Sequence, residues 1–380
     1  MILYGSMPTD LRVRKEAQSL SDQGIKVQVI CYQATGNLND FSYKISPQNY
    51  LSEDISGGGS SLSILSLLSF WIFTVRVLLQ INLNNSNNRI HAHDFTALPP
   101  AVILKIFNLR AKLIYDAHEL APDAVGEIFP IYLKIIAYII EIFGLLFADA
   151  LIGVSKYHLY IMNKRYRWII PPYYPVYNYP MEVELNQNKF DEVEELLQKH
   201  QLDKDKSIFV VYASYIVKNR GFDEIIRAFR TINNPKIILL LAGDGPYRAH
   251  LESKIKDMDN IKYLGYLHYT VYYTLLKYCD VGICLIDPYS NLNNLIGFPN
   301  KMTEYLATGT KILCTNLVSF QKEFNEGLAF PISSISNIEE IASGINSLVN
   351  RRKEKTTDTN PINGNYLWEN NIEALMLAYS

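Results

Sequence analysis

The sequence predicts an α/β protein with two doubly wound units, each a parallel sheet covered by helices. Short apolar runs, which are typical of buried strands, alternate with helical patterns over residues 1–172 and again from about residue 207 onward. Between these halves, residues 169–180 (IIPPYYPVYNYP) are dense in proline and tyrosine. Because proline disfavours regular structure, this segment indicates a domain boundary.

The composition is that of a globular protein with room for two separate cores. The chain has 380 residues, of which 48% are hydrophobic and 19% charged. A net charge of −2 and a pI near 6.4 provide no basic footprint, which argues against a nucleic-acid partner. We expect no signal peptide, because a strand pattern follows Met1 at once. The cysteines lie in or beside apolar runs without metal-type spacing and resemble reduced core residues, so we expect a cytoplasmic protein. The cysteines are Cys31, Cys279, Cys284 and Cys314.

Two long apolar stretches allow more than one interpretation. Leu62–Ile81 contains a single charge, Arg76, and Ile128–Ala148 contains only Lys134 and Glu141, so both reach membrane-spanning length. Lys134 and Glu141 share one helical face, and serines interrupt the first stretch. We therefore expect helices that pack on the sheet or lie at a bilayer surface, with spanning helices as the alternative.

The first half opens with a strand and a capped helix. Leu11–Gln23 has a helical pattern that Thr9 or Asp10 can cap. Arg12 and Arg14 could approach a substrate anion, although charges on a first helix are more often solvated. We expect strands at Ile2–Tyr4, Lys26–Cys31, Arg89–Ala92, Lys112–Tyr115, Ala150–Val154 and Trp168–Ile170.

Two predicted strands of the first half end in a histidine and an acid. Residues 90–94 read IHAHD and residues 115–119 read YDAHE. Open α/β sheets bind ligands at the carboxyl ends of their strands, so both histidine pairs are expected to face a ligand. A metal site is the alternative, but the residues lack the helical spacing of compact ligand motifs, so we predict no metal. That alternative set is His93, Asp94, Asp116, His118 and Glu119.

The second half repeats the alternation. Arg220 and Gly221 follow its first strand, where a guanidinium suits phosphate oxygens. Residues 243–246 (GDGP) form a tight turn after the second strand, where glycine permits positive φ. We expect strands at Ser207–Tyr212, Lys236–Ala242, Ile261–Leu264, Val281–Ile286 and Lys311–Thr315.

Residues 297–316 (GFPNKMTEYLATGTKILCTN) predict a short helix followed by a buried strand. Pro299 suits the first helical position and Gly309 ends the helix. Lys301 and Glu304 share a face opposite the apolar stripe, and the helix N-terminus favours an anion. The plainer alternative is an exposed ion pair. The stripe comprises Met302, Tyr305 and Leu306.

This segment and residues 10–24 (DLRVRKEAQSLSDQG) carry a resemblance that runs along nearly the whole chain. The chain resembles GT-B glycosyltransferases of family 4, the glycosyl transferases group 1. The resemblance implies two Rossmann-like doubly wound domains that face a central cleft. It implies an acceptor-side domain at residues 1–172, a nucleotide-sugar-binding domain at residues 173–360, and a helix at residues 361–380 that crosses back to the first domain.

The same resemblance assigns roles to residues. It implies that Arg220 grips the donor pyrophosphate, that Glu304 binds the ribose, and that His118 lies near the reacting sugar. It places His93 and Asp94 on the acceptor side. Further donor-binding positions are Gly5, Lys218, Gly243, Gly245, Tyr266, Asn300 and Lys301.

Two positions depart from the family pattern. Ile296 stands where the family has the first Glu of a paired motif, and Tyr215 stands where it has a first phosphate-binding cation. Asn293 and Asn294 are close enough in sequence to replace the glutamate, and Lys218 is the candidate for the cation.

The resemblance implies a hexosyltransferase-like glycosyltransferase (EC 2.4) without cofactor or metal. Its donor would be a UDP- or GDP-linked sugar, and its acceptor a glycan or lipid-linked hydroxyl in bacterial-type surface polysaccharide or glycoconjugate synthesis. Retention of configuration and peripheral contact with the inner membrane face are also implied. The alternatives are a sugar-nucleotide epimerase or phosphorylase of the same fold and a non-catalytic partner subunit.

Overall fold

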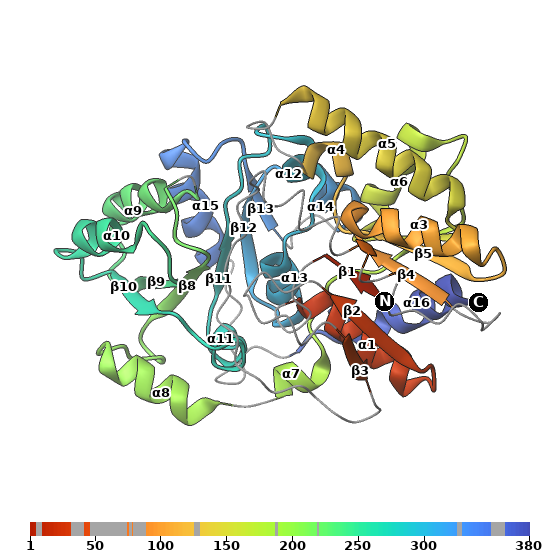
Figure 1. Ribbon diagram of the computed structural model, residues 1–380. Helices are drawn as coiled ribbons and strands as arrows, with labels where there is room; N and C mark the ends of the chain where they lie inside the picture. The colour runs from red at the N-terminus through yellow and green to blue at the C-terminus, as the bar shows by residue number, and fades with distance from the viewer. Residues whose placement is uncertain are drawn as a thin grey trace. The chain divides into compact units, whose positions relative to one another are not determined.

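In the computed structural model, the chain folds into two compact units (Figure 1). Unit 1 comprises Met1–Tyr177 and Asn371–Ser380, and unit 2 comprises Asn178–Asn370. The boundary thus follows Tyr177, five residues after the position expected from the sequence, and the last ten residues belong with unit 1. The structure describes residues 1–4, 10–31, 42–45, 74–75, 78, 89–124, 130–186, 189–218, 220–324, 329–350 and 362–380. Gly5 and nearly all of the stretch 62–81 lie outside the described residues.

Unit 1 contains a seven-stranded sheet of order β3-β2-β1-β4-β5-β6-β7. β3 pairs antiparallel with β2, and the other pairs are parallel. The strands are β1 (Ile2–Leu3), β2 (Val27–Cys31), β3 (Ser42–Ile45), β4 (Arg89–His93), β5 (Lys112–Ala117), β6 (Ala150–Gly153) and β7 (Tyr173–Pro175).

The helices of unit 1 include the first predicted helix and the C-terminal one. Asp10 caps α1 as predicted, because its carboxylate accepts from the backbone N–H groups of Arg12 and Val13. Gly24 follows α1 with a φ of +81°, which glycine adopts without strain. The helices are α1 (Leu11–Asp22), η2 (Phe95–Ala97), α3 (Leu98–Phe107), α4 (Ala121–Ala124), α5 (Ile131–Phe147), α6 (Lys156–Tyr166) and α16 (Ile372–Tyr379).

Unit 2 contains a six-stranded sheet of order β10-β9-β8-β11-β12-β13, parallel throughout. Its strands are β8 (Ile208–Ala213), β9 (Ile237–Ala242), β10 (Ile261–Gly265), β11 (Val281–Cys284), β12 (Lys311–Thr315) and β13 (Ala329–Ile332). Its helices are α7 (Glu182–Asn186), α8 (Phe190–Lys199), α9 (Phe222–Thr231), α10 (Arg248–Ile255), α11 (Tyr269–Leu276), α12 (Leu292–Ile296), α13 (Asn300–Ala307), α14 (Val318–Glu323), α15 (Ile338–Asn350), η3 (Gly364–Tyr366) and η4 (Trp368–Asn371).

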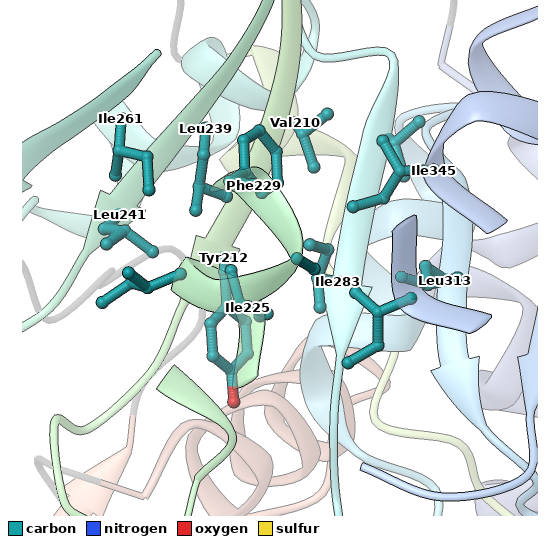
Figure 2. Packing of buried hydrophobic residues seen from close by; sticks show 14 of the residues in the cluster. Val210, Tyr212, Ile225, Phe229, Leu239, Leu241, Ile261, Ile283, Leu313 and Ile345 are labelled. Carbon is teal, nitrogen blue, oxygen red and sulfur yellow. The ribbon is translucent and has the colours of Figure 1, made fainter. Parts of the chain in front are cut away.

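The core of unit 2 lies between its sheet and the helices α9 and α15. Figure 2 shows Ile225 and Phe229 of α9 and Ile345 of α15 among strand side chains that are almost fully buried. Tyr212 belongs to this cluster, and its hydroxyl points away from the other labelled side chains (Figure 2). That hydroxyl donates to the backbone carbonyl of Arg220. The core therefore makes direct contact with the loop that follows β8.

One predicted strand is wrong. Trp168–Ile170 is a turn with Trp168 86% exposed, and the strand that pairs with β6 is Tyr173–Pro175, inside the segment expected to be irregular. β7 is the edge strand of its sheet, and an edge position tolerates proline because one side of the strand needs no hydrogen bonds. The strands β3 and β13 were not predicted. Among the helices that the structure describes, none combines the length and apolar character needed to cross a bilayer.

Candidate functional site

The sheet of unit 2 reverses its order between β8 and β11. From β8 the chain proceeds to β9 and β10 on one side, and from β11 to β12 and β13 on the other. Ligands of open α/β sheets bind beyond the carboxyl ends of the strands at such a reversal. Arg220 lies in the loop after β8, Cys284 ends β11, and α13 carries Lys301 and Glu304. The predicted donor residues therefore belong to the segments around this reversal.

Gly243 and Gly245 allow two loops to lie against each other. A Cβ atom on Gly243 would lie 2.0 Å from the carbonyl oxygen of Ser214, and one on Gly245 would lie 2.4 Å from that of Ile216. Both glycines have positive φ, +127° and +159°. Ser214 N donates to Ala242 O at 3.0 Å, and Ile216 N to Asp244 O at 2.9 Å. These glycines therefore shape the loop that leads to Arg220, and their contact with a donor stays a prediction.

Lys301 lies close to the other charged groups of unit 2 that were singled out from the sequence. Its Nζ is 4.7 Å from the centroid of the Tyr212 ring. Burial lowers the pKa of Lys301, and the Arg220 guanidinium lowers it further, whereas Cys284 and Glu304 oppose the change. Arg220 and Glu304, which are 84 residues apart in sequence, thus both act on one ammonium group. Arg220 itself is exposed.

Glu304 already has a partner in the structure. The stripe of α13 is buried as predicted, with Met302, Tyr305 and Leu306 no more than 3% exposed. Burial raises the pKa of Tyr273 on α11, and the negative charge of the Glu304 carboxylate adds to the effect. The side chains of Glu304 and Tyr273 are therefore neighbours.

The start of α13 is anchored to the beginning of unit 2. Asn178 Nδ2 donates to Asn300 Oδ1 at 2.8 Å, and Thr303 Oγ1 lies 3.1 Å from the Asn178 carbonyl. Pro299 is the N-cap, one position earlier than expected, and it provides no side-chain cap to the first amide groups of the helix. An uncapped N-terminus of this kind favours an anion.

The two residues that depart from the family pattern differ in burial. Ile296 is 2% exposed in α12, so it is a core residue. Asn294 donates to Asp287 O at 3.1 Å and to Ser290 Oγ at 2.6 Å, so its side chain holds its own loop together. Tyr215 and Lys218 are exposed in the loop after β8, as is Tyr266 after β10.

Asp116, at the end of β5, is the centre of a buried polar cluster in unit 1. Its Oδ2 atom accepts from Arg12 Nε at 3.0 Å, from His93 Nδ1 at 3.1 Å and from His118 Nε2 at 2.9 Å. Its Oδ1 atom accepts from Arg12 Nη2 at 2.8 Å. Arg12 is therefore not solvated, as charges on a first helix usually are. The Arg12 guanidinium and His118 overcome the effect of burial and hold the pKa of Asp116 well below its usual range.

His118 is paired with a second carboxylate. Its backbone N–H donates to Asp94 Oδ1 at 3.1 Å, and its Nδ1 lies 3.3 Å from Asp94 Oδ2. Burial lowers the pKa of His118, but Asp94 and Asp116 outweigh burial and raise it to about 10. The structure thus joins three of the predicted residues, His93, Asp94 and His118, through Asp116.

A metal site in this cluster has to be weighed against Arg12. Glu16, His91, His93 and Asp116 present ligand atoms within 4.8 Å of one another, and His91 Nε2 lies 3.5 Å from Glu16 Oε2. Arg12 Nε is 3.1 Å from Glu16 Oε1 and also bonds Asp116. The Arg12 guanidinium therefore compensates the charge of Asp116, whereas burial and the neighbouring Asp116 raise the pKa of Glu16 well above its usual range. Of the alternative metal set expected from the sequence, only His93 and Asp116 belong to this group.

Sequence reasoning missed Glu16, His91 and the pairing of Arg12. Arg12 and Glu16 are four residues apart on α1, and His91 and His93 are two apart on β4, so each pair shares one face. His91 Nδ1 also lies 2.8 Å from the hydroxyl of Tyr379 on α16. The spacing within each pair could have been noticed in the sequence, but it does not show that α1 and β4 pack against each other.

Comparisons with known proteins show a family similarity in the second half of the chain and the fold of the whole chain. The family model described as "Glycosyl transferases group 1" matches residues 192–361, which include Arg220, Lys301 and Glu304. No curated protein matches the chain.

Solved structures match over the whole chain at low identity. A sucrose-phosphate synthase from Thermosynechococcus elongatus has a TM-score of 0.65 and 15% identity, with 100% of this chain and 94% of that chain covered. A glycosyltransferase from Rickettsia africae has a TM-score of 0.62 and 14% identity over 100% and 94%. HepE from Anabaena, in complex with UDP, has a TM-score of 0.60 and 14% identity over 99% and 94%. These matches show the GT-B fold, and the family model adds a similarity to the glycosyl transferases group 1 family over residues 192–361.

Proposed function

We propose that this chain is a glycosyltransferase that moves a sugar from a UDP- or GDP-linked donor to a hydroxyl of a glycan or lipid-linked acceptor, with retention of configuration. The observation that carries the proposal is that Tyr212 contacts both the Lys301 ammonium and the Arg220 backbone at the reversal of the unit 2 sheet, with Glu304 on the same helix as Lys301. The structures of HepE with UDP, with UDP and glucose, and with UDP-glucose favour a uridine nucleotide among the donors to test first.

The reaction breaks the bond between the sugar C1 and the diphosphate oxygen and forms one between C1 and the acceptor oxygen. The electron pair of the broken bond leaves on the diphosphate, which also takes up the acceptor proton. Arg220, Lys301 and the amide groups at the start of α13 would stabilise that developing charge. Glu304 would anchor the ribose. Fixed cations of the chain then serve where other enzymes use a metal ion.

The acceptor side of the proposal rests on unit 1. The side chain of Asp94 is 34% exposed, whereas that of His93 is fully buried and donates to Asp116. Asp94 is therefore the group that we assign to the acceptor hydroxyl, with His93 in a supporting position. His118 lies between Asp94 and Asp116 and would carry a positive charge there.

We also propose that unit 1 contacts the cytoplasmic face of a membrane through helix α5. The most exposed residues of α5 are all aliphatic or aromatic, and none of them is charged. The two charges of the helix lie elsewhere, since Lys134 is only half-exposed and Glu141 is buried against Tyr115 and Tyr166. A soluble helix normally places charges outward. The large exposed residues are Ile131, Tyr132, Ile135, Ile136, Tyr138, Ile139, Phe143 and Leu146.

A basic and aromatic corner adjoins this face and favours a bilayer with anionic headgroups. Tyr138 of α5 stacks on Tyr166 at the end of α6, with ring centroids 5.7 Å apart. The exposed Lys164, Arg167 and Trp168 lie beside Tyr166 in sequence, and the Arg167 guanidinium is 4.7 Å from the Trp168 ring. Tryptophan and arginine are typical of the headgroup level, where an amphipathic helix lies in the plane of the interface.

Vesicle flotation tests the membrane proposal. The full chain should float with vesicles of phosphatidylglycerol and phosphatidylcholine, and less with phosphatidylcholine alone. Ile135→Ser combined with Phe143→Ser should abolish flotation, while the exposed Tyr289→Ser of unit 2 should not. Failure of the unchanged protein to float with either vesicle would remove this proposal and leave the donor chemistry untouched.

A thermal-shift panel of sugar nucleotides tests the donor. A ligand that binds only the folded state raises the melting temperature, so UDP, UDP-glucose, GDP and GDP-mannose can be ranked directly. We expect at least one nucleotide diphosphate to stabilise the chain by several degrees. If every nucleotide in the panel leaves the melting temperature unchanged at millimolar concentration, the proposed donor class is wrong.

A further inference from the structure

A chain of charged side chains in unit 1 runs from the interior to the acceptor-side aspartate. Arg12 donates through Nε and Nη2 to both oxygens of Asp116, at 3.0 and 2.8 Å, and through Nη1 to Val176 O at 2.6 Å. Asp116 accepts from His118 Nε2, and His118 Nδ1 faces Asp94. Arg12 is 4% exposed and Asp116 fully buried, whereas Asp94 reaches the surface. The order is therefore Arg12, Asp116, His118, Asp94.

The backbone of Asp94 is held in a rare conformation. Its φ is +62°, and Asp94 and Gln201 are the two residues other than glycine with positive φ in the described part of the chain. The Asp94 N–H donates to Asp116 O at 2.9 Å, and the His118 N–H donates to the Asp94 carboxylate at 3.1 Å. Such strain persists only where the surroundings impose it, and it concentrates at functional sites. The direction of the Asp94 carboxylate is thus set by its contacts with the end of β5.

We propose that Arg12 and Asp116 are positioning residues that act through His118. They hold its ring as an imidazolium whose two N–H groups point at carboxylates, and in this way they set the direction and the charge of Asp94. The inference rests on the proposed function, because the acceptor role of Asp94 is itself a proposal. It also gives His118 a different task from direct contact with the donor sugar, because both of its ring nitrogens face carboxylates.

The charged surroundings of His118 agree with this assignment. Asp94 and Asp116 outweigh burial and the neighbouring Arg12, so the pKa of His118 is raised to about 10. The ring is therefore protonated at neutral pH and cannot act as the base that deprotonates the acceptor hydroxyl. The other titratable groups that interact with His118 are Glu16, His93, Glu119 and His158.

A purely structural ion pair is the competing explanation, and Asp116→Asn separates the two. The asparagine keeps the shape and an oxygen for the His118 Nε2–H group but removes the negative charge. If the carboxylate holds the imidazolium, its loss returns the pKa of His118 toward the ordinary value of about 6.5. If the pair is purely structural, the pKa of His118 still falls in Asp116→Asn but kcat does not change, and the positioning role is excluded.

The experiment is a pH titration of histidine ring signals in the full-length protein, with His118→Gln to identify the resonance. We expect the wild-type His118 signal to remain constant from about pH 6 to about pH 9, and Asp116→Asn and Asp94→Asn each to bring its midpoint into this range. Asp123→Asn is the matched control, since Asp123 pairs with Arg165 on the same unit at 3.1 Å. It should leave the His118 signal as in the wild type.

Two further readouts link the titration to catalysis. With the donor selected by the thermal-shift panel, Asp116→Asn should lower kcat at least tenfold and leave the donor KM and the affinity for UDP unchanged. Wild-type His118 titrating near its ordinary pKa, or an Asp116→Asn variant with unchanged titration, overturns the inference. Because the titration needs no donor, its failure is distinct from failure of the proposed function.

Discussion

The ammonium group of Lys301 lies 4.7 Å from the centroid of the Tyr212 ring, and the hydroxyl of the same tyrosine donates to the Arg220 carbonyl. One core side chain therefore touches both segments that carry the predicted donor-site cations of unit 2. Cation–π contacts of this kind contribute about 1 kcal/mol when partly buried. Packing of the core and placement of the cations are thus linked through Tyr212.

Removal of the Tyr212 hydroxyl should loosen the Arg220 loop without exposing the core. In Tyr212→Phe the ring remains beneath Lys301, and the bond to the Arg220 carbonyl is lost. We expect the free energy of unfolding to fall by about 1 kcal/mol, the usual net value of one hydrogen bond, and UDP affinity to fall a few-fold. Chemical denaturation and calorimetric titration with UDP measure these effects. An affinity equal to that of the wild type would show that the hydroxyl does not place Arg220.

Removal of the Lys301 ammonium should weaken donor binding more than folding. A charge-assisted hydrogen bond contributes about 1.5–3 kcal/mol, so Lys301→Ala should raise the Kd for UDP about tenfold or more. Lys236→Ala is the control, because Lys236 is exposed at the amino end of β9, the opposite edge of the same sheet. Equal Kd values for the two variants would exclude Lys301 from the phosphate site.

The turn after β9 should not tolerate a side chain. Gly243→Ala would place a Cβ 2.0 Å from the Ser214 carbonyl oxygen at a φ of +127°, so the two loops would have to separate. We expect a loss of about 2 kcal/mol or more of stability, with weaker nucleotide binding. Gly364→Ala has open space around its Cβ and should stay within about 0.5 kcal/mol of the wild type. Comparable melting temperatures for both variants would contradict this reading of the turn.

Unit 1 should lose stability in mild acid because of His158. This side chain is 1% exposed, and neither ring nitrogen has a hydrogen-bond partner among the described residues. Burial, with Arg12 nearby, lowers the pKa of His158 to about 3. The ring is thus neutral when folded but titrates near pH 6.5 when unfolded, so its contribution is full above about pH 6.5 and is lost as the pH falls toward 3.

Chemical denaturation at two pH values measures this effect. Between pH 7 and pH 5 the contribution of His158 should fall by about 2 kcal/mol. In His158→Leu the difference between the two pH values should shrink by that amount. His250→Leu, at an exposed histidine of unit 2, should leave the difference in unfolding free energy between pH 7 and pH 5 unchanged. A pH difference in His158→Leu as large as that of the wild type would exclude this histidine as the source.

The sequence predicted most strands, and the helix α13 with its two faces, because these features follow from local periodicity. Met302, Tyr305 and Leu306 share one face whatever the rest of the chain does, so their burial could be predicted. Lys301 shows the limit of this reasoning. Its position on the opposite face suggested an exposed pair with Glu304, but it lies over Tyr212, 89 residues earlier in the chain.

The cluster around Asp116 could not be predicted, because its contacts join residues that are far apart in sequence. Arg12 and Asp116 are 104 residues apart, and Tyr379 meets His91 across 288 residues. General experience with charges on surface helices favoured a solvated Arg12, and tertiary packing decided otherwise. The edge strand β7 was misplaced for a related reason, since only its pairing with β6 distinguishes it from a proline-rich linker.

The most direct test of the proposed mechanism is the turnover of Arg220→Ala with the donor that stabilises the chain most. Arg227→Ala is the matched control, because Arg227 is an exposed arginine on α9 that pairs with Glu224. Removal of one group that stabilises the leaving diphosphate costs about 3 kcal/mol at the transition state, so turnover should fall roughly a hundredfold while the fold is retained and Arg227→Ala keeps wild-type turnover. Unchanged turnover in a folded Arg220→Ala variant would contradict the proposed donor site.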